Sequence, residues 1–421
     1  GEVFIRGCSG IFLMGNFVMM LLRKFKIRKE NKWKLATFVL AVLVAIATTL
    51  YIFRYEPFSS GLEITDELGG NIFPVTILST ATTDAQLIVP GDSTYLGNPK
   101  SCIAIKIRSP HANSKLHIEL AETPFFAHSI SEFILPESGK EYLIFPDVIW
   151  NYQALLENTQ AMPVTVSVQA KLNNGRVYSA VHTYSVRSIN ECLLGYIDSN
   201  MKFHDTGEFF AAYVNEDNPN ISQVLREALD SRIVNRFWGY QSKDTTVVDK
   251  QVYALWYVLQ KRGFKYSSIS NSSLSSNVVF TQRVRTFDDA LKSAQINCVD
   301  GSVLFASLLK AVNINPILVR VPGHMFVGYY TDRLHRNIHF LETSMIGDVN
   351  LDDFFPEEKL DSTMMGKSQE SVSKFMFEKS KEYATRIYNE HKDLIHSGKV
   401  NYMFLEIDKA TRAYVQPIAG K

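Results

Sequence analysis

The sequence predicts an α+β protein in three parts: a membrane anchor, a β-sandwich, and a final region in which a cysteine-bearing helix packs on an antiparallel sheet. Three observations support this class. An uncharged apolar run near the start has the length of a bilayer span, strand-like alternation fills the next stretch, and helical spacing follows it. At roughly 150 residues per domain, a chain of 421 residues has room for two or three domains.

Charge is distributed unevenly along the chain. The 44 Lys and Arg residues against 43 Asp and Glu leave a net charge of +1. Residues 23–34 alone carry seven basic residues and one acid, and residues 1–22 cancel, so subtracting +6 from +1 leaves −5 for the rest. A phosphate-binding surface needs a basic domain, so we expect no nucleic-acid partner. A hydrophobic content of 46% rules out disorder as the overall state.

The apolar run LATFVLAVLVAIATTLYIF, residues 35–53, is the expected transmembrane helix and the contact with the lipid bilayer. A buried core helix is the alternative, but this run is apolar on every side and follows a basic stretch. Positive charge stays on the cytoplasmic side, which makes residues 1–34 cytoplasmic and residues 54–421 periplasmic or extracellular. Ala45-Ile46-Ala47 resembles a signal-peptide cleavage site, yet the apolar run continues beyond it, which favours an uncleaved anchor.

Residues 66–190 are predicted to form a β-sandwich of immunoglobulin-like size. PVTVSVQAKL and RVYSAVHTYSV alternate in polarity on either side of an Asn-Gly turn at Asn174-Gly175, which is a strong hairpin signal. Further expected strands are Ile72–Ile77, Cys102–Ile107, Leu116–Leu120 and Tyr142–Phe145.

After about residue 190 the pattern becomes helical and then mixed. VDKQVYALWYVLQKRG keeps helical spacing, and CVDGSVLFASLLKAV is a mostly apolar helix that ends before Asn315-Pro316. Expected strands follow at residues 317–321, 324–330 and 338–342, then a helix at 369–396 and a strand at 402–407.

The four cysteines are too few and too scattered for a disulfide scaffold. A bridge between Cys102 and Cys192 is compatible with an exported domain, but their spacing does not establish one. No CxxC pair or Cys/His ligand spacing occurs, so we expect no metal site.

Three residues have the chemistry of a nucleophile, a base and an orienting acid. Cys298 stands at the start of a predicted helix, where unpaired N–H groups and the helix dipole favour the thiolate. His324 opens the strand after the turn Val321-Pro322-Gly323, and Glu342 ends the next strand. Such strand ends lie side by side, so the imidazole can accept the thiol proton while the carboxylate orients the ring.

Each of these residues also has an ordinary structural explanation. A lone Cys298 is typical of a small buried apolar side chain, His324 of a turn histidine, and Glu342 of a solvated acid. His335 and His339 are rival bases, with His335 in the charged turn TDRLHRN.

The runs QRVR, NCVDGSVLFASLLKAVNINPILVRVPGHMFVGYY and FLETS closely resemble the bacterial transglutaminase-like branch of the papain-like cysteine protease superfamily, over about residues 205–347. The resemblance implies a papain-like fold in which Cys298 is the nucleophile, His324 the general base and acid, and Glu342 the orienting carboxylate. Ile296 stands where the motif usually has glycine, and Glu342 replaces the commoner aspartate.

The resemblance makes residues 191–421 a transglutaminase-like cysteine hydrolase domain with a helical C-terminal extension. It implies acyl transfer at an amide of a protein or peptide in the cell envelope, with water favoured over an amine as acceptor and with no cofactor. Gln282 is a candidate oxyanion donor, although an exposed strand glutamine is the ordinary alternative. Asp300 is expected to stabilise the helix start. The competing hypothesis is a catalytically silent envelope protein that binds or scaffolds on the same fold.

Overall fold

The computed structural model describes residues 32–54, 61–90, 94–173, 175, 177–268, 274–347 and 349–418. The chain divides into two compact units, residues 1–59 and residues 60–421. Helices and mostly antiparallel sheets occur in separate stretches of the second unit, which confirms the α+β class.

In the first unit, α2 (Lys32–Arg54) is a helix over the expected apolar run. Apolar side chains near its centre are exposed, among them Phe38, Leu40 and Leu43. None of the helices in the described part of the chain is both long and apolar enough to span a membrane. Residues 1–31, most of the expected cytoplasmic segment, lie outside the described residues.

Two sheets make up the β-rich part of the second unit. The four-stranded sheet has the order β1 (Glu63–Ile64), β4 (Ile105–Arg108), β8 (Glu141–Phe145), β3 (Tyr95–Gly97). The five-stranded sheet has the order β2 (Asn71–Ile72), β11 (Val177–Val186), β10 (Met162–Leu172), β5 (Ser114–Leu120), β7 (Ser129–Leu135). A short pair, β6 (Phe126–Ala127) with β9 (Ile149–Trp150), and the helices η2 (Pro99–Ser101) and α4 (Tyr152–Glu157) complete this part.

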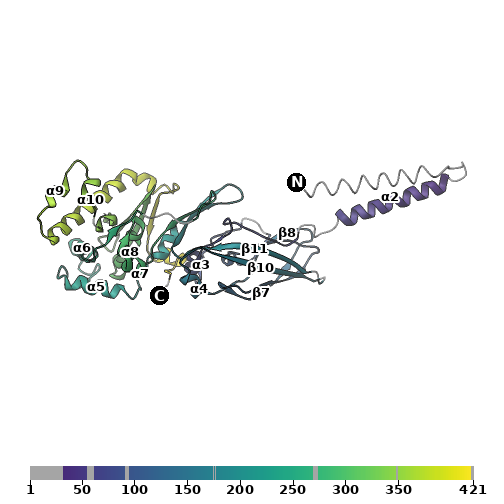
Figure 1. The fold of residues 1–421 in the computed structure, drawn as a ribbon, viewed down its shortest axis with the longest axis horizontal. Coiled ribbons are helices and arrows are strands. Elements are labelled where there is room, and N and C mark those ends of the chain that lie inside the picture. Colours follow the sequence, from purple (N-terminus) through teal and green to yellow (C-terminus); the bar gives the residue numbers. More distant parts are fainter. Residues whose placement is uncertain are drawn as a thin grey trace. The chain divides into compact units, whose positions relative to one another are not determined.

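The predicted hairpin is the longest strand pair. β10 and β11 pair in antiparallel register from Met162↔Val186 to Lys171↔Val177 and run side by side in Figure 1. Gly175 adopts a φ of +77°, which suits a glycine in a tight turn, while Asn174 lies outside the described residues. The alternating side chains of β10 are buried on one face, as the period of two requires: Val164, Val166, Val168, Ala170, Leu172.

One expected strand is wrong. The run Ile72–Ile77 contains only the end of β2, and α3 (Pro74–Thr80) begins two residues later. Pro74 occupies the first turn of α3, where its fixed φ is suited to a helix and its missing N–H costs nothing. The apolar β-branched residues in this run therefore did not predict its conformation correctly.

The antiparallel sheet expected near the end of the chain has the order β19 (Ile338–Leu341), β18 (His324–Tyr330), β17 (Pro316–Val321), β20 (Met403–Glu406). The helix α8 (Cys298–Ala311) packs on β18 and β17, and α10 (Gln369–Ile395) packs on β19. Both helices and the final strand lie where the sequence predicts them.

Shorter elements surround this sheet. They are β12 (Glu191–Ile197), β13 (Phe203–Asp205), β14 (Lys265–Tyr266), β15 (Val279–Arg283), β16 (Gln295–Ile296), η3 (Gly207–Tyr213), η4 (Thr343–Ile346), η5 (Leu351–Asp353), α5 (Ile221–Asp230), α6 (Thr245–Lys261), α7 (Phe287–Ser293), α9 (Leu360–Met364) and α11 (Lys409–Tyr414). β14 pairs in parallel with β16, the strand directly before α8.

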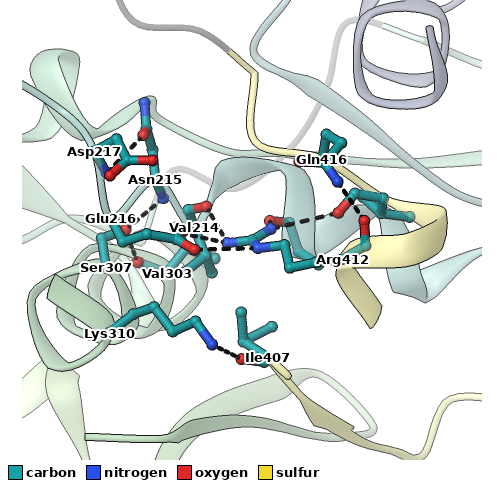
Figure 2. Close-up of polar contacts among 12 residues, drawn as sticks. Val214, Asn215, Glu216, Asp217, Val303, Ser307, Lys310, Ile407, Arg412 and Gln416 are labelled. Atoms are coloured by element: carbon teal, nitrogen blue, oxygen red, sulfur yellow. Dashed lines mark hydrogen bonds and ion pairs between the residues drawn. The ribbon is translucent and has the colours of Figure 1, made fainter. Parts of the chain in front are cut away.

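The C-terminal segment is held to α8 and η3 by polar contacts. Figure 2 shows Arg412 donating to the Glu216 carboxylate at 2.6 Å and to the Val214 carbonyl at 2.7 Å. Lys310 of α8 donates to the Ile407 carbonyl at 2.6 Å. Since these groups are largely buried, the contacts fix the end of the chain against the helix that starts at Cys298.

A single hydrophobic cluster crosses the boundary expected at residue 190. It contains Leu68, Phe73 and Val75 from the first part together with Tyr213 and Trp256 from the second. The two predicted domains therefore share part of one core within the second unit.

Candidate active site

The start of α8 is a capping box. The Asn297 side chain accepts the Asp300 N–H at 2.8 Å, and the Asp300 carboxylate accepts the Asn297 N–H at 3.1 Å. This reciprocal pair satisfies N–H groups that an α-helix start leaves unpaired. It places Cys298 at the first helical position, and Asp300 has the structural role expected for it.

Asp300 also ties this helix start to the segment after β15. Its carboxylate accepts the Arg285 N–H at 2.7 Å and forms an ion pair with the Arg285 guanidinium at 2.5 Å. Burial raises the pKa of Asp300, while the hydrogen bonds and charge of Arg285 and the hydrogen bond from Asn297 oppose the rise. The position of the thiol thus depends on a buried polar network.

His324 and Glu342 are brought together by the β18–β19 pairing. Gly323, with a φ of +74°, turns the chain into β18, and Glu342 follows directly after β19. His324 Nε2 lies 2.5 Å from Glu342 Oε2, and the glutamate side chain is completely buried.

The other carboxylate oxygen of Glu342 is held as well. Oε1 accepts the Ser344 N–H at 3.0 Å and the Ser344 hydroxyl at 2.6 Å. The backbone N–H of Glu342 donates to the Ser380 hydroxyl of α10 at 2.9 Å. A buried carboxylate with both oxygens bonded is rigid, which suits a group that orients a ring. Ser344 and Ser380 were not among the predicted site residues; the Glu-x-Ser spacing, typical of a cap, is the one local signal for Ser344.

The histidine is strongly biased toward its charged form. Burial by itself lowers the pKa of His324, but the charge of Glu342 and the hydrogen bonds to Cys298 and Glu342 outweigh it and raise the pKa to about 10. Nε2 is bonded to Glu342, which leaves Nδ1 as the ring nitrogen that this bond does not occupy. Both Glu342 and Cys298 thus act on the charge of His324.

Close backbone packing sets the distance between helix and carboxylate. A Cβ atom added to Gly301 of α8 would lie 2.7 Å from Thr343 Oγ1 and 2.9 Å from Thr343 Cβ. The Ser302 hydroxyl donates to the Cys298 carbonyl at 2.6 Å and lies 3.4 Å from Thr343 Oγ1. η4 therefore lies directly against α8, beside Glu342.

Tyr266 of β14 pairs with Ile296 of β16, two residues before Cys298. Burial, followed by the charges of Cys298 and Glu342, raises the pKa of Tyr266. A Cβ atom on Gly347 would lie 2.7 Å from the Tyr266 backbone nitrogen, so this strand is held tightly between β16 and η4.

The two other histidines considered as the general base, His335 and His339, are bonded to other side chains. His335 stacks on Tyr330 with ring centroids 3.8 Å apart, and its Nε2 lies 2.7 Å from the Asn315 amide. His339 Nδ1 lies 2.8 Å from Asp249 Oδ1.

Gln282 lies on β15 and donates from its side-chain amide to the Arg283 carbonyl at 3.1 Å. Its role as an oxyanion donor stays a prediction.

The described cysteines are all free thiols, Cys102 and Cys192 included. Burial raises the pKa of Cys102 to about 12 and that of Cys192 still further, so both remain neutral near pH 7. No cluster of metal-binding side chains occurs among the residues that the structure describes.

No protein-family model matches the chain, and no curated protein matches its sequence.

Proposed function

We propose that this chain is a cysteine enzyme of the transglutaminase-like kind that transfers an acyl group from an amide to water. The observation that carries the proposal is His324, which is bonded through Nε2 to the buried Glu342 and whose pKa is raised in part by Cys298. A thiol at a helix start beside such a histidine is an activated nucleophile.

The proposed reaction has two halves, in which a thioester on Cys298 is first formed and then hydrolysed. The Cys298 thiolate attacks the amide carbonyl carbon, and the C–N bond breaks as His324 gives its proton to the leaving amine. His324 then takes a proton from water, the hydroxyl attacks the thioester, and the C–S bond breaks to release the acid and the thiolate. Glu342 keeps the ring oriented throughout and offsets its positive charge while the ring is protonated. Gln282 is the proposed hydrogen-bond donor to the oxyanion.

Thiol alkylation tests this proposal. Iodoacetamide at neutral pH should label Cys298 rapidly, while Cys102 and Cys192, whose thiols are neutral, serve as internal controls. We expect His324→Ala to slow the labelling by at least about tenfold, and Cys298→Ala and His324→Ala each to abolish amide cleavage with the fold intact. Glu342→Gln should cost less than loss of the nucleophile, but still a factor of roughly 10² to 10⁴ in turnover.

A labelling rate that is the same in wild type and His324→Ala would contradict the proposal. It would favour the silent binding or scaffolding protein instead.

The place of action proposed is the cell envelope, with residues 54–421 outside the cytoplasm and a protein or peptide as substrate. The basic stretch before Leu35 and the apolar run after it support this topology. Protease added to intact spheroplasts should digest residues 54–421, with a cytoplasmic protein as the protected control. Full protection of this part would overturn the topology.

A further inference from the structure

The backbone of Glu342 lies just beyond the strand ladder. The pairing of β19 with β18 ends at Leu341, opposite Val327, and Glu342 is the next residue. Glu342 is completely buried, so its N–H and C=O need partners within the protein. The position of the carboxylate that holds His324 therefore depends on what these two backbone groups bond to outside the ladder.

One hydroxyl of α10 meets both groups. Ser380 Oγ accepts the Glu342 N–H at 2.9 Å and donates to the Glu342 carbonyl at 3.1 Å, and the Ser380 side chain is completely buried. A serine inside a helix often turns its hydroxyl back to the carbonyl four residues earlier. Ser302 and Ser307 of α8 do so, whereas Ser380 connects its helix to the first residue of another element.

The helix that carries Ser380 is itself fixed to β19. Lys381, the next residue, lies with Nζ 2.9 Å from Asp249 Oδ2 of α6. The other oxygen of Asp249 lies 2.8 Å from Nδ1 of His339, which is on β19. These ionic contacts link α10 to the strand that ends directly before Glu342, so the Ser380 hydroxyl is held at a set place beside that residue.

The remaining polar contacts of Glu342 differ in kind. Ser344 bonds its carboxylate, and the Met345 N–H donates to its carbonyl at 3.2 Å. Both residues belong to η4, the turn that Glu342 begins, so these bonds move with the turn. They do not set the distance from Glu342 to His324, which is on β18. The bond to Ser380 comes from a separate helix and restrains the turn as a whole.

We propose that Ser380 is a positioning residue: by holding the backbone of Glu342, it keeps Glu342 Oε2 in contact with His324 Nε2. Ser380 acts through Glu342 and needs no contact with the substrate or the thiol. The consequence for catalysis rests on the proposed function, in which His324 is the general base and acid.

NMR titration of the histidine rings in the full chain tests this role, with the His324 signal identified by its loss in His324→Gln. In Ser380→Ala the Glu342 N–H still faces the Ser380 carbonyl at 3.3 Å and the Glu342 carbonyl keeps Met345, so we expect the fold to persist. The pKa of His324, about 10 in the wild type, should fall by at least about one unit as the contact with the carboxylate loosens.

Ser373→Ala is the matched control. It removes the same oxygen from a buried serine of the same helix, seven residues earlier, and should leave the titration of His324 unchanged. Should Ser380→Ala not fold, Ser380→Cys is the second variant, because a thiol is a weaker hydrogen-bond partner than a hydroxyl and the pKa should again fall. In a chain that cleaves amides, the alkaline limb of the profile of turnover against pH should move to lower pH by the same amount.

An unchanged titration of His324 in the folded Ser380 variant would overturn the proposal. Equal shifts in the Ser380 and Ser373 variants would also overturn it, because they would report a general loosening of α10. The titration does not require a reactive thiol. If the pKa falls as expected and Cys298 proves unreactive, the positioning role stands and the enzyme function falls; a reactive Cys298 with an unchanged titration removes the positioning role alone.

Discussion

The buried carboxylate of Glu342 makes the largest of the contributions that raise the pKa of His324. A carboxylate without solvent access needs compensation, and here one oxygen receives Ser344 while the other receives the imidazole. The histidine then carries its proton at a pH where a free imidazole is neutral.

This pair predicts a pH dependence of stability. The pKa of His324 is raised from 6.5 to about 10 on folding, so between these values the folded chain holds a proton that the unfolded chain has lost. The stabilisation is fully present below about pH 6.5 and disappears as the pH rises toward 10, with a steepest slope of about 1.4 kcal/mol per pH unit. The free energy of unfolding, measured by urea titration at several pH values from 6 to 10, gives this slope.

Glu342→Gln is the control for that experiment. It removes the strongest of the interactions that raise the pKa of His324, so the free energy of unfolding of the variant should change less over the same range. Other titrating groups contribute equally to both chains and cancel in the difference. Parallel curves for the two chains would show that the pair does not couple to folding.

At the scale of elements, the close contact between α8 and η4 positions the helix that starts at Cys298. Gly301 is the residue that permits it, because any side chain there meets Thr343. Both residues are buried, so neither has free space into which to move.

Gly301→Ala should therefore destabilise the protein by ~1–3 kcal/mol, although the same change in an unobstructed helix stabilises it by up to ~1 kcal/mol. The displaced helix start should also slow iodoacetamide labelling of Cys298. Gly61→Ala is the matched control, because no atom lies within 4 Å of the added Cβ. If both variants unfold at the wild-type urea concentration, the helix does not depend on this close approach.

At the scale of the whole molecule, the second unit is joined by its core and by its C-terminus. The Gln416 N–H donates to the Ser79 carbonyl at 2.9 Å, and the Thr83 hydroxyl donates to the Tyr414 carbonyl at 2.9 Å. Phe73 belongs to the cluster that contains most of the second part's core. Residues near the start of this unit thus support elements near its end.

A chain of residues 188–421 should for this reason unfold at a lower urea concentration than a chain of residues 61–421. Loss of Leu68, Phe73 and Val75 removes three buried side chains, each contributing roughly 1.5–3 kcal/mol. Circular dichroism during urea titration measures the difference. Equal, cooperative transitions would instead support two independent domains with a boundary at residue 190.

The sequence was sufficient for features that depend on neighbours along the chain. The alternation and turn of residues 162–186 predict the hairpin, and the apolar period of residues 298–311 predicts α8. The positions of Cys298 at a helix start, of His324 at the opening of a strand and of Glu342 directly after the next strand followed from the same local patterns.

Tertiary structure decided everything that depends on residues distant in sequence. The run Ile72–Ile77 has strand-like residues, yet Pro74 and packing against the shared core favour a helix. The partners of Glu342 include Ser380, thirty-eight residues away, and the partner of Gly301 is Thr343. Local sequence encodes conformation through short-range sterics and hydrogen bonds, whereas these contacts exist only after the chain has packed into one core.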